Sequence, residues 1–292
     1  MGLFVERPKF IKRFKYLIFM EHLVSICIPC YNAGETIKET LQSLINQTYS
    51  DFEIIISDNH STDNTIEIIR SFDDDRIKIF ENESNLGVIQ NYHLALSRAK
   101  GKYVKLLCAD DIISPDCIEK QVNVFLSHPN DNIVMVAAEK NVINKDNKIL
   151  FRKPFPGKAG IYDGKKAIKK SFLHGTSIFG EPGCVMFDRE AAKKTSEFLI
   201  DPSLTYIIEF NFYCQLLQHG NLFVIKEPLF SFRVISTSGT AGFKWSQARI
   251  FNALIDKYQK DGVINYSWFV RTYCKTMAWI MCIARNLVFK FA

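Results

Sequence analysis

The sequence predicts an α/β protein with a mostly parallel, Rossmann-like sheet, helices on both faces of that sheet, and a C-terminal helical extension. Two observations come from the first half of the chain. Short apolar runs alternate with segments of helical spacing, and these strand–helix units repeat at roughly 25–30 residues. The third observation is the helical, strongly apolar pattern beyond residue 237, which contains Trp245, Trp268 and Trp279.

The first strand is expected at 23–28, where a nearly continuous apolar run ends at Pro29. In the helix that follows, Ile37, Leu41 and Leu44 recur at helical spacing. Similar patterns predict further strands at 52–56, 77–80 and 102–107, and helices at 35–46, 65–71, 88–98 and from Pro115 to about residue 127.

The second half of the chain is less regular. An apolar run predicts a strand at 133–138, and a polar segment predicts a turn at 144–148. Further strands are expected at 180–187, 222–225 and 229–235, the last two as a closing pair, with a helix at 206–219. We expect four parts, namely a basic and aromatic leader (1–21), two halves of one α/β domain (22–128 and 129–240) and the helical extension (241–292).

The net charge and the cysteine usage limit the classes of ligand and the cellular compartment that suit this chain. The formal net charge of +6 is mild, so it does not indicate nucleic acid and instead suits an anionic small molecule or a lipid surface. The eight cysteines are scattered and lie mostly in apolar runs, which favours free thiols in a reducing cytoplasm over a disulfide scaffold. The single C-x-x-C pair, Cys27 and Cys30, closes a strand and lacks the second pair that a zinc site would need.

Polar side chains follow three of the predicted parallel strands. They are Tyr31-Asn32, Asp58-Asn59 and Asp110-Asp111. In sheets of this kind the ligand lies beyond the carboxyl ends of the strands, so we expect these three turns to converge on one cleft.

Four ordered sequence blocks resemble the inverting GT-A glycosyltransferases of family 2. The blocks are 24–32 (VSICIPCYN), 47–53 (QTYSDFE), 57–63 (SDNHSTD) and 106–111 (LLCADD). The resemblance covers 22–128 with family spacing, continues more loosely to about 235, and does not reach the tail after 240. It implies a GT-A fold in which 22–128 binds a nucleotide-diphosphate sugar and 129–240 binds the acceptor.

The resemblance assigns the nucleotide to the turns after the first strands. An aromatic ring at Tyr31 can stack on a base, Asn32 offers both a donor and an acceptor, and Asp58 can accept a hydrogen bond from a uracil ring. The residues expected to contact the donor are Pro29, Tyr31, Asn32, Glu35, Asp58, Asn91, Asp111 and Arg233. Asn91 has a structural amide as its alternative role, and Arg233 is expected to hold either the diphosphate or a loop. Two positions depart from the family, because Gln90 replaces a frequent arginine and His60 a frequent glycine.

A divalent cation, Mg²⁺ or Mn²⁺, is expected at the acidic turn. The family's D-x-D motif maps onto Cys108-Ala-Asp110, so Asp110 is the expected metal ligand, with Asp111 beside it. Cysteine is a poor ligand for Mg²⁺, so the role of the first motif position is open.

An inverting transfer needs one carboxylate to take the proton of the acceptor hydroxyl. The resemblance places it at the start of a helix in the second half, where Glu209 is the acid in the matching window. Asp201 is the second choice for the base. Glu181, in the turn at 180–183, is a candidate for binding sugar hydroxyls, with a turn residue as the alternative.

The expected acceptor is a saccharide or a lipid-linked saccharide in cell-envelope polysaccharide assembly, with a UDP-sugar as the default donor. The basic and aromatic segment 274–291 favours either contact with a membrane surface or packing, including a homodimer through the C-terminal helices. We therefore expect a cytoplasmic protein, with peripheral attachment to the inner face of the plasma membrane as one alternative. The basic leader is either a membrane arm or sequence upstream of a start at Met20.

Two other functions were weighed against this one. A catalytically inactive nucleotide-sugar-binding or scaffold protein of the same fold is the alternative that Cys108 supports. A dinucleotide oxidoreductase would need G-x-G-x-x-G after the first strand, where this chain has Pro-Cys-Tyr-Asn-Ala-Gly.

Overall fold

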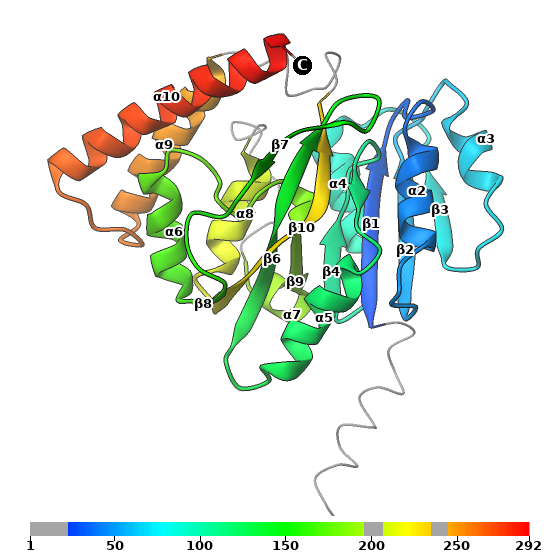
Figure 1. The fold of residues 1–292 in the computed structure, drawn as a ribbon, viewed down its shortest axis with the longest axis horizontal. Helices are drawn as coiled ribbons and strands as arrows, with labels where there is room; N and C mark the ends of the chain where they lie inside the picture. The colour runs from blue at the N-terminus through cyan, green and yellow to red at the C-terminus, as the bar shows by residue number, and fades with distance from the viewer. Residues whose placement is uncertain (1–22, 196–206, 235–244, 292) are drawn as a thin grey trace, which may run out of the picture.

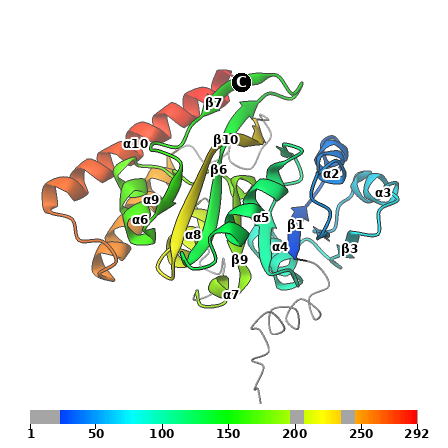
Figure 2. The same cartoon turned by 60° about the horizontal axis from the view of Figure 1, so that its bottom comes forward.

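A single mixed sheet runs through the protein, with helices on both faces and a group of helices at one end (Figures 1 and 2). The computed structural model describes residues 23–195, 207–234 and 245–291. Over these residues the sheet has ten strands in the order β3-β2-β1-β4-β9-β6-β10-β5, with β7 paired to β6 and β8 paired to β10. The predicted leader 1–21 lies outside the described residues.

The four predicted strands of the first half are present and parallel. They are β1 (Val24–Cys30), β2 (Phe52–Asp58), β3 (Ile77–Glu81) and β4 (Tyr103–Leu106). Strands β1 and β2 are buried along their whole length. Burial on both sides explains why these runs are almost continuously apolar rather than alternating.

The four predicted helices of the first half are also present. They are α2 (Ile37–Ile45), α3 (Thr65–Arg70), α4 (Val88–Ser97) and α5 (Cys117–Ser127). Helix α2 buries Ile37, Leu41 and Leu44, which are the residues that its spacing predicted. Helix α4 packs on β1 and β2, and it begins after Gly87, whose φ of 81° favours glycine.

Antiparallel strands enter the sheet in the second half of the chain. Strand β9 (Val185–Asp188) pairs with β4 on one side and β6 (Ile133–Ile143) on the other, antiparallel to both. The remaining strands are β7 (Ile149–Lys153), β8 (Gly160–Tyr162), β10 (Asn221–Arg233) and the short β5 (Ile112–Ile113). Strand β10 is nevertheless parallel to its neighbour β6, so the sheet as a whole is mostly parallel, as predicted.

Two predictions for the second half were wrong in detail. The expected pair 222–225 and 229–235 is one strand, β10, whose pairing with β6 continues past Pro228 through register shifts on both sides of the proline. The expected strand 180–187 begins only at Val185, because Pro182–Cys184 form a 3₁₀ turn, η1. Gly183 in that turn lies so close to the ring of Phe230 that a Cβ atom would stand 2.1 Å from it.

The predicted C-terminal helical extension is present. It consists of α9 (Ser246–Lys260) and α10 (Trp268–Phe291), which pack against each other, and α10 also packs against α6 (Gly164–Leu173) (Figure 1). The second half also contains α7 (Arg189–Ala192) and α8 (Ile208–Leu216). Within the described residues, no helix is long and apolar enough to cross a membrane.

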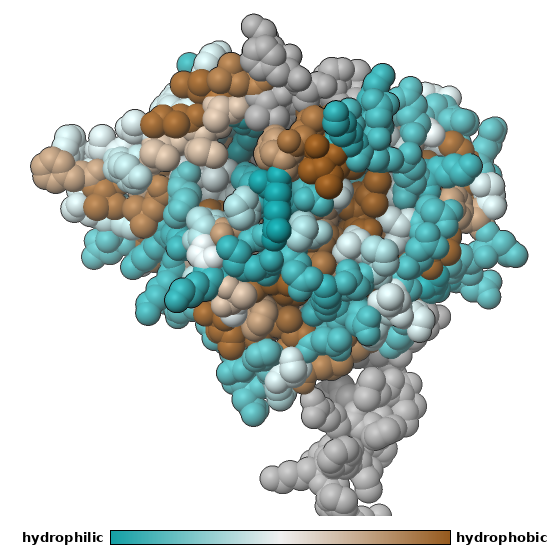
Figure 3. Space-filling model, viewed as in Figure 1, coloured by the Kyte–Doolittle hydropathy of each residue, from teal (hydrophilic) through white to brown (hydrophobic). Residues whose placement is uncertain are grey.

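Large apolar side chains remain exposed on α10. Figure 3 shows brown, hydrophobic surface over this part of the molecule. The exposed residues are Trp268, Phe269, Tyr273, Ile280, Ile283 and Leu287. All eight cysteines are free, as the sequence predicted, and all but Cys108 are buried.

Candidate active site

The acidic turn after β4 brings three metal-binding residue types together. Cys108, Asp110 and Asp111 each offer one ligand atom, and these atoms lie within 4.8 Å of one another. Helix α2 holds the turn in place, because the Thr36 hydroxyl donates to the carbonyl oxygen of residue 109 at 2.9 Å and the Thr40 hydroxyl donates to that of Asp111 at 2.9 Å.

The two aspartates of this turn lie in a poorly solvated environment. Burial raises the pKa of Asp111 well above its usual range, and the neighbouring charge of Asp110 raises it further. Burial also raises the pKa of Asp110, against the opposing effect of Arg233. Among the described residues, Oδ2 of Asp111 has no hydrogen-bond partner, although it is fully buried. A buried carboxylate oxygen without a donor is costly, so this atom is suited to a cation.

Arg233, at the end of β10, connects the acidic turn to other segments through hydrogen bonds. Its Nε donates to the carbonyl oxygen of Asp110 at 2.8 Å, and its backbone N–H donates to Asp111 Oδ1 at 3.0 Å. The rest of the guanidinium contacts the Lys145 carbonyl, the Asn147 side chain and Glu39. The side chain is almost fully buried. These contacts favour the loop-holding role over a diphosphate contact.

The turn after β1 is joined to the turn after β2 by hydrogen bonds. Asn32 has a φ of 48° and donates its backbone N–H to the Ser61 hydroxyl, while its side-chain oxygen accepts from the Thr62 N–H at 2.8 Å. The side-chain oxygen of Asn32 is therefore already engaged within the loops. The preceding Tyr31 is 48% exposed, so its ring is free to stack on a planar ligand.

Asp58 ends β2 beside Cys30 and is buried. Its Oδ2 accepts from the Ser61 N–H at 2.9 Å, and its Oδ1 accepts from the Ser61 hydroxyl at 2.5 Å. The carboxylate thus shapes the loop at the carboxyl end of β2, next to the Tyr31 turn. Of the other expected donor residues, Pro29 is buried within β1 and Glu35 lies just before α2.

Asn91 has the contacts of a structural amide. Its Nδ2 donates to the carbonyl oxygens of Ser57 at 2.9 Å and Cys30 at 3.3 Å, and its Oδ1 accepts from Asn82. The side chain therefore ties the ends of β1 and β2 to α4. Because each polar atom of its amide is used in this way, the structural alternative describes Asn91.

Glu209 lies in the first turn of α8, close to the acidic turn. Burial raises its pKa. Its charge in turn raises the pKa of the Cys108 thiol and of the Tyr92 hydroxyl, both of which burial shifts most. Glu209 and the acidic turn therefore share one poorly solvated region. The second candidate base, Asp201, lies outside the described residues.

Two side chains near the acidic turn did not stand out in the sequence. The Tyr92 hydroxyl, from α4, lies 3.4 Å from Cys108 Sγ. Lys140, from β6, is buried and forms an ion pair with Glu181, so the candidate sugar-binding acid is already paired. Tyr92 fits an ordinary helical pattern, and Lys140 lies beyond the strand predicted to end at 138. The sequence therefore did not indicate a role at the site for either residue.

Three loops and one helix therefore meet at one edge of the sheet. The turns after β1, β2 and β4 follow neighbouring strands, and α8 adds Glu209 from the second half. The prediction that these turns would converge agrees with the hydrogen bonds that join them.

A family model, Glycosyl transferase family 2, matches residues 25–196 of this chain. The match includes the turns after β1, β2 and β4, and it ends before α8.

One similar protein is the Escherichia coli UDP-Glc:alpha-D-GlcNAc-diphosphoundecaprenol beta-1,3-glucosyltransferase WfgD. It is 34% identical over 127 residues, which are 44% of this chain and 49% of WfgD. The matched stretch thus spans about half the length of that relative.

Two solved structures share the fold. Residues 1–349 of Staphylococcus aureus TarS in complex with UDP-GlcNAc superpose with a TM-score of 0.65 at 16% identity, over 90% of this chain and 71% of that one. The Pyrobaculum calidifontis mannosyltransferase PcManGT in complex with GDP-Man and Mn²⁺ has a TM-score of 0.55 at 14% identity, over 96% of this chain and 82% of that one.

Proposed function

Because this chain belongs to glycosyl transferase family 2 and has a GT-A-like fold, we propose that it transfers a sugar from a UDP-sugar to a saccharide or lipid-linked acceptor with inversion. The observation that carries the proposal is the position of Glu209 beside the acidic turn of Asp110 and Asp111. This arrangement supports a base at Glu209 next to a cation at the acidic turn.

The donor would lie against the turns after β1 and β2. Tyr31 presents an exposed ring, and Asp58 and Asn32 shape the neighbouring loops. The similar proteins named above include one whose name specifies UDP-Glc and one solved with UDP-GlcNAc, which supports UDP as the nucleotide.

The residues of the acidic turn fit a divalent cation. Asp110 and Asp111 supply carboxylate oxygens, which hard cations such as Mg²⁺ and Mn²⁺ prefer, and Oδ2 of Asp111 has no donor among the described residues. Cys108 is a weaker contributor, because burial raises the pKa of its thiol well above the usual range and keeps it protonated. When bound, such a cation supplies charge that offsets the negative charge of a departing diphosphate.

Glu209 would take the proton of the acceptor hydroxyl. Burial raises the pKa of its carboxyl, which makes the carboxylate a stronger proton acceptor than an exposed glutamate. One displacement at the sugar carbon with one base gives inversion. Burial raises the pKa of the Tyr92 hydroxyl and of the Cys108 thiol, and the nearby charge of Glu209 raises both further.

The acceptor and the cellular setting are further parts of the proposal. WfgD, by its name, acts on a diphosphoundecaprenol-linked sugar, which supports a lipid-linked acceptor in envelope polysaccharide assembly. The exposed apolar residues of α10 support attachment to the inner face of the plasma membrane, and a homodimer through the same helix is the alternative. Liposome flotation and sedimentation velocity separate these two, because only a dimer changes the mass in the absence of lipid.

The decisive experiment is a screen of nucleotide sugars with and without Mn²⁺. A ligand that binds the folded state raises its melting temperature, so the true donor should stabilise the protein more in the presence of the cation. The best donor is then incubated with candidate acceptors and the release of UDP is measured. Stabilisation without UDP release from any acceptor or water would favour an inactive scaffold, the alternative that Cys108 supports. Absence of stabilisation by all nucleotide sugars would contradict the proposal.

A further inference from the structure

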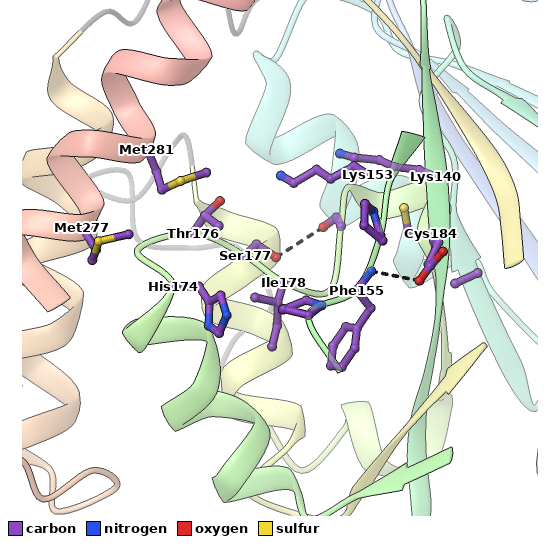
Figure 4. Close-up of a pocket in the computed structure, with 15 residues that line it drawn as sticks. Lys140, Lys153, Phe155, His174, Thr176, Ser177, Ile178, Cys184, Met277 and Met281 are labelled. Carbon is purple, nitrogen blue, oxygen red and sulfur yellow. Dashed lines mark hydrogen bonds between the residues drawn. The ribbon is translucent and has the colours of Figure 1, made fainter. Parts of the chain in front are cut away.

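A cavity of about 220 Å³ lies between the sheet and the C-terminal helices. Figure 4 shows Lys140 and Lys153 reaching into it from the sheet, with Met277 and Met281 of α10 on the opposite wall. The sheet order places β1 and β2 on one side of β4 and places β9 and β6 on the other. The cavity is therefore separated from the nucleotide turns by β4 and its acidic turn.

The cavity has positive charge that the described residues do not fully balance. Lys140 and Lys153 stand directly opposite each other on β6 and β7, an arrangement that is unfavourable for two like charges. The Lys140 ammonium is paired with Glu181, whereas the Lys153 ammonium has no hydrogen-bond or ion-pair partner among the described residues. Arg285, on α10, binds Thr176 at the cavity wall and the neutral side chain of Gln247.

Glu139, an acidic residue that lines the cavity, does not neutralise the positive charge of the lysines. Glu139 is buried and pairs with two other cations, Arg152 at 2.5 Å and Lys226 at 3.3 Å. Burial lowers the pKa of Lys140 to about 7 and that of Lys153 to about 8, and the nearby charge of Arg285 contributes to both shifts. Mutual repulsion of this kind is relieved when an anion binds among the cations.

The remaining wall is apolar and adaptable. Phe155, Ile178, Met277 and Met281 line the side away from the lysines. Methionine side chains adjust to ligands of irregular shape. The cavity thus combines a cationic wall with an apolar one, which suits an anionic group attached to an apolar chain.

The cavity lies within electrostatic range of the candidate active site. Asp111 interacts electrostatically with both Lys140 and Cys184, and both of these residues line the cavity. We propose that this cavity is an acceptor subsite that binds a phosphate or carboxylate group of the acceptor between Lys140 and Lys153. The assignment to the acceptor rests on the proposed transferase function, whereas the binding of an anion does not.

Binding is measured by NMR from the signals of the methionine methyl groups in the 292-residue protein. Met277 and Met281 report on the cavity, while Met135 and Met186 are fully buried in the sheet and act as internal controls. Octyl phosphate, below its critical micelle concentration, and inorganic phosphate are titrated in the presence of saturating UDP, so that the nucleotide turns are filled. Octyl glucoside is the neutral control.

We expect octyl phosphate to shift the Met277 and Met281 signals and leave those of Met135 and Met186 in place. Lys153→Gln should weaken this binding at least tenfold, and the exposed Lys165→Gln should not change it. A response to inorganic phosphate as well would show that the anion alone suffices, and a response to octyl phosphate only would show that the apolar wall contributes. Equal binding of octyl glucoside, no shift with either phosphate, or unchanged binding in Lys153→Gln would overturn the proposal.

The outcome is independent of the transferase test. If the wild type binds no UDP but octyl phosphate still shifts Met277 and Met281, the donor proposal fails and the anion site stands. If a UDP-sugar binds and its sugar is transferred, while octyl phosphate does not move the methionine signals, the subsite fails alone.

Discussion

Arg233 donates its backbone N–H to the Asp111 carboxylate at 3.0 Å, and the two residues belong to different halves of the chain. The same arginine holds the carbonyl oxygen of Asp110 and the loop around Asn147. The geometry of the acidic turn therefore depends on a residue at the end of the last strand.

Replacement of Arg233 by lysine should destabilise the protein. A lysine ammonium cannot reach the several acceptors that the planar guanidinium spans, so buried carbonyl groups lose their donors. We expect the free energy of unfolding to fall by about 2–4 kcal/mol, measured by urea denaturation. Glu39→Gln is the matched control, because Glu39 is 46% exposed and its ion pair should contribute less than about 1 kcal/mol. An Arg233→Lys variant as stable as the wild type would contradict this account.

Asp110→Ala should abolish the part of UDP binding that depends on a divalent cation. Removal of this carboxylate leaves the turn with one acid and one protonated thiol. In the wild type, ligand at a hundredfold excess over its dissociation constant stabilises the protein by about 2.7 kcal/mol. We expect the increment that Mn²⁺ adds to the melting temperature with UDP to disappear in Asp110→Ala and to persist in Asp116→Ala, a nearby aspartate paired with Lys120. An unchanged increment in Asp110→Ala would remove it from the cation site.

Glu209→Gln should keep donor binding and lose transfer. Glutamine fills the same space but cannot accept the proton of the acceptor, so we expect the transfer rate to fall by at least about a hundredfold with UDP affinity within twofold of the wild type. Burial already disfavours the charged carboxylate, so this variant should be no less stable than the wild type at neutral pH. Transfer by Glu209→Gln at the wild-type rate would refute the assignment of the base.

The pH dependence of the rate follows from the same carboxyl. Its folded-state pKa is raised, so the group is protonated and inactive as a base at acidic pH, and the rate should climb as pH rises through that pKa. The stability effect has the opposite sign. The neutral Glu209 carboxyl contributes fully to the free energy of unfolding below the unfolded-state pKa. That contribution is lost as pH rises through the folded-state pKa. A pH–rate profile measured between pH 4 and 8 should show an acidic limb whose midpoint lies above the usual range of glutamate, about 4.3.

Cys108→Asp should make the protein more dependent on cations. A third carboxylate among ligand atoms that lie within 4.8 Å of one another adds repulsion when no cation is bound and adds a ligand when one is. We expect a lower melting temperature without metal and a larger rise with Mn²⁺ than in the wild type. Cys108→Ser is the control for loss of the thiol, and an equal response of the two variants would show that the carboxylate is not in the cation site.

The first half of the fold could be predicted from the sequence because its parallel strands are buried on both faces. A continuous apolar run as short as the one in β1, closed by Pro29, favours a buried strand over a helix, and α2 shows its buried face in the spacing of Ile37, Leu41 and Leu44. The second half was harder, because β7 has an exposed face, β8 is three residues long, and Pro228 interrupts a strand that continues beyond it. A local sequence pattern cannot show that a strand continues past a bulge, because that depends on the neighbouring strand with which it pairs.

Only part of the candidate site could be predicted from the sequence, for a related reason. Asp110, Asp111 and Glu209 belong to motifs that carry chemistry, so they stood out by residue type and position. The structural role of Asn91 and the loop contacts of Arg233 depend on which backbone carbonyls lie nearby, and no motif records that. The position of Lys140 opposite Lys153 arises from a strand pairing that the sequence did not reveal.

The insertion of β9 between β4 and β6 ties the two halves into one cooperative unit. A crossover between related genes near residue 128 would pair β4 of one parent with β9 of the other, so the side chains packed on both strands would come from different proteins. Substitutions in loops and cavity walls leave this pairing between the halves intact, whereas exchange of a whole half changes one of its two sides.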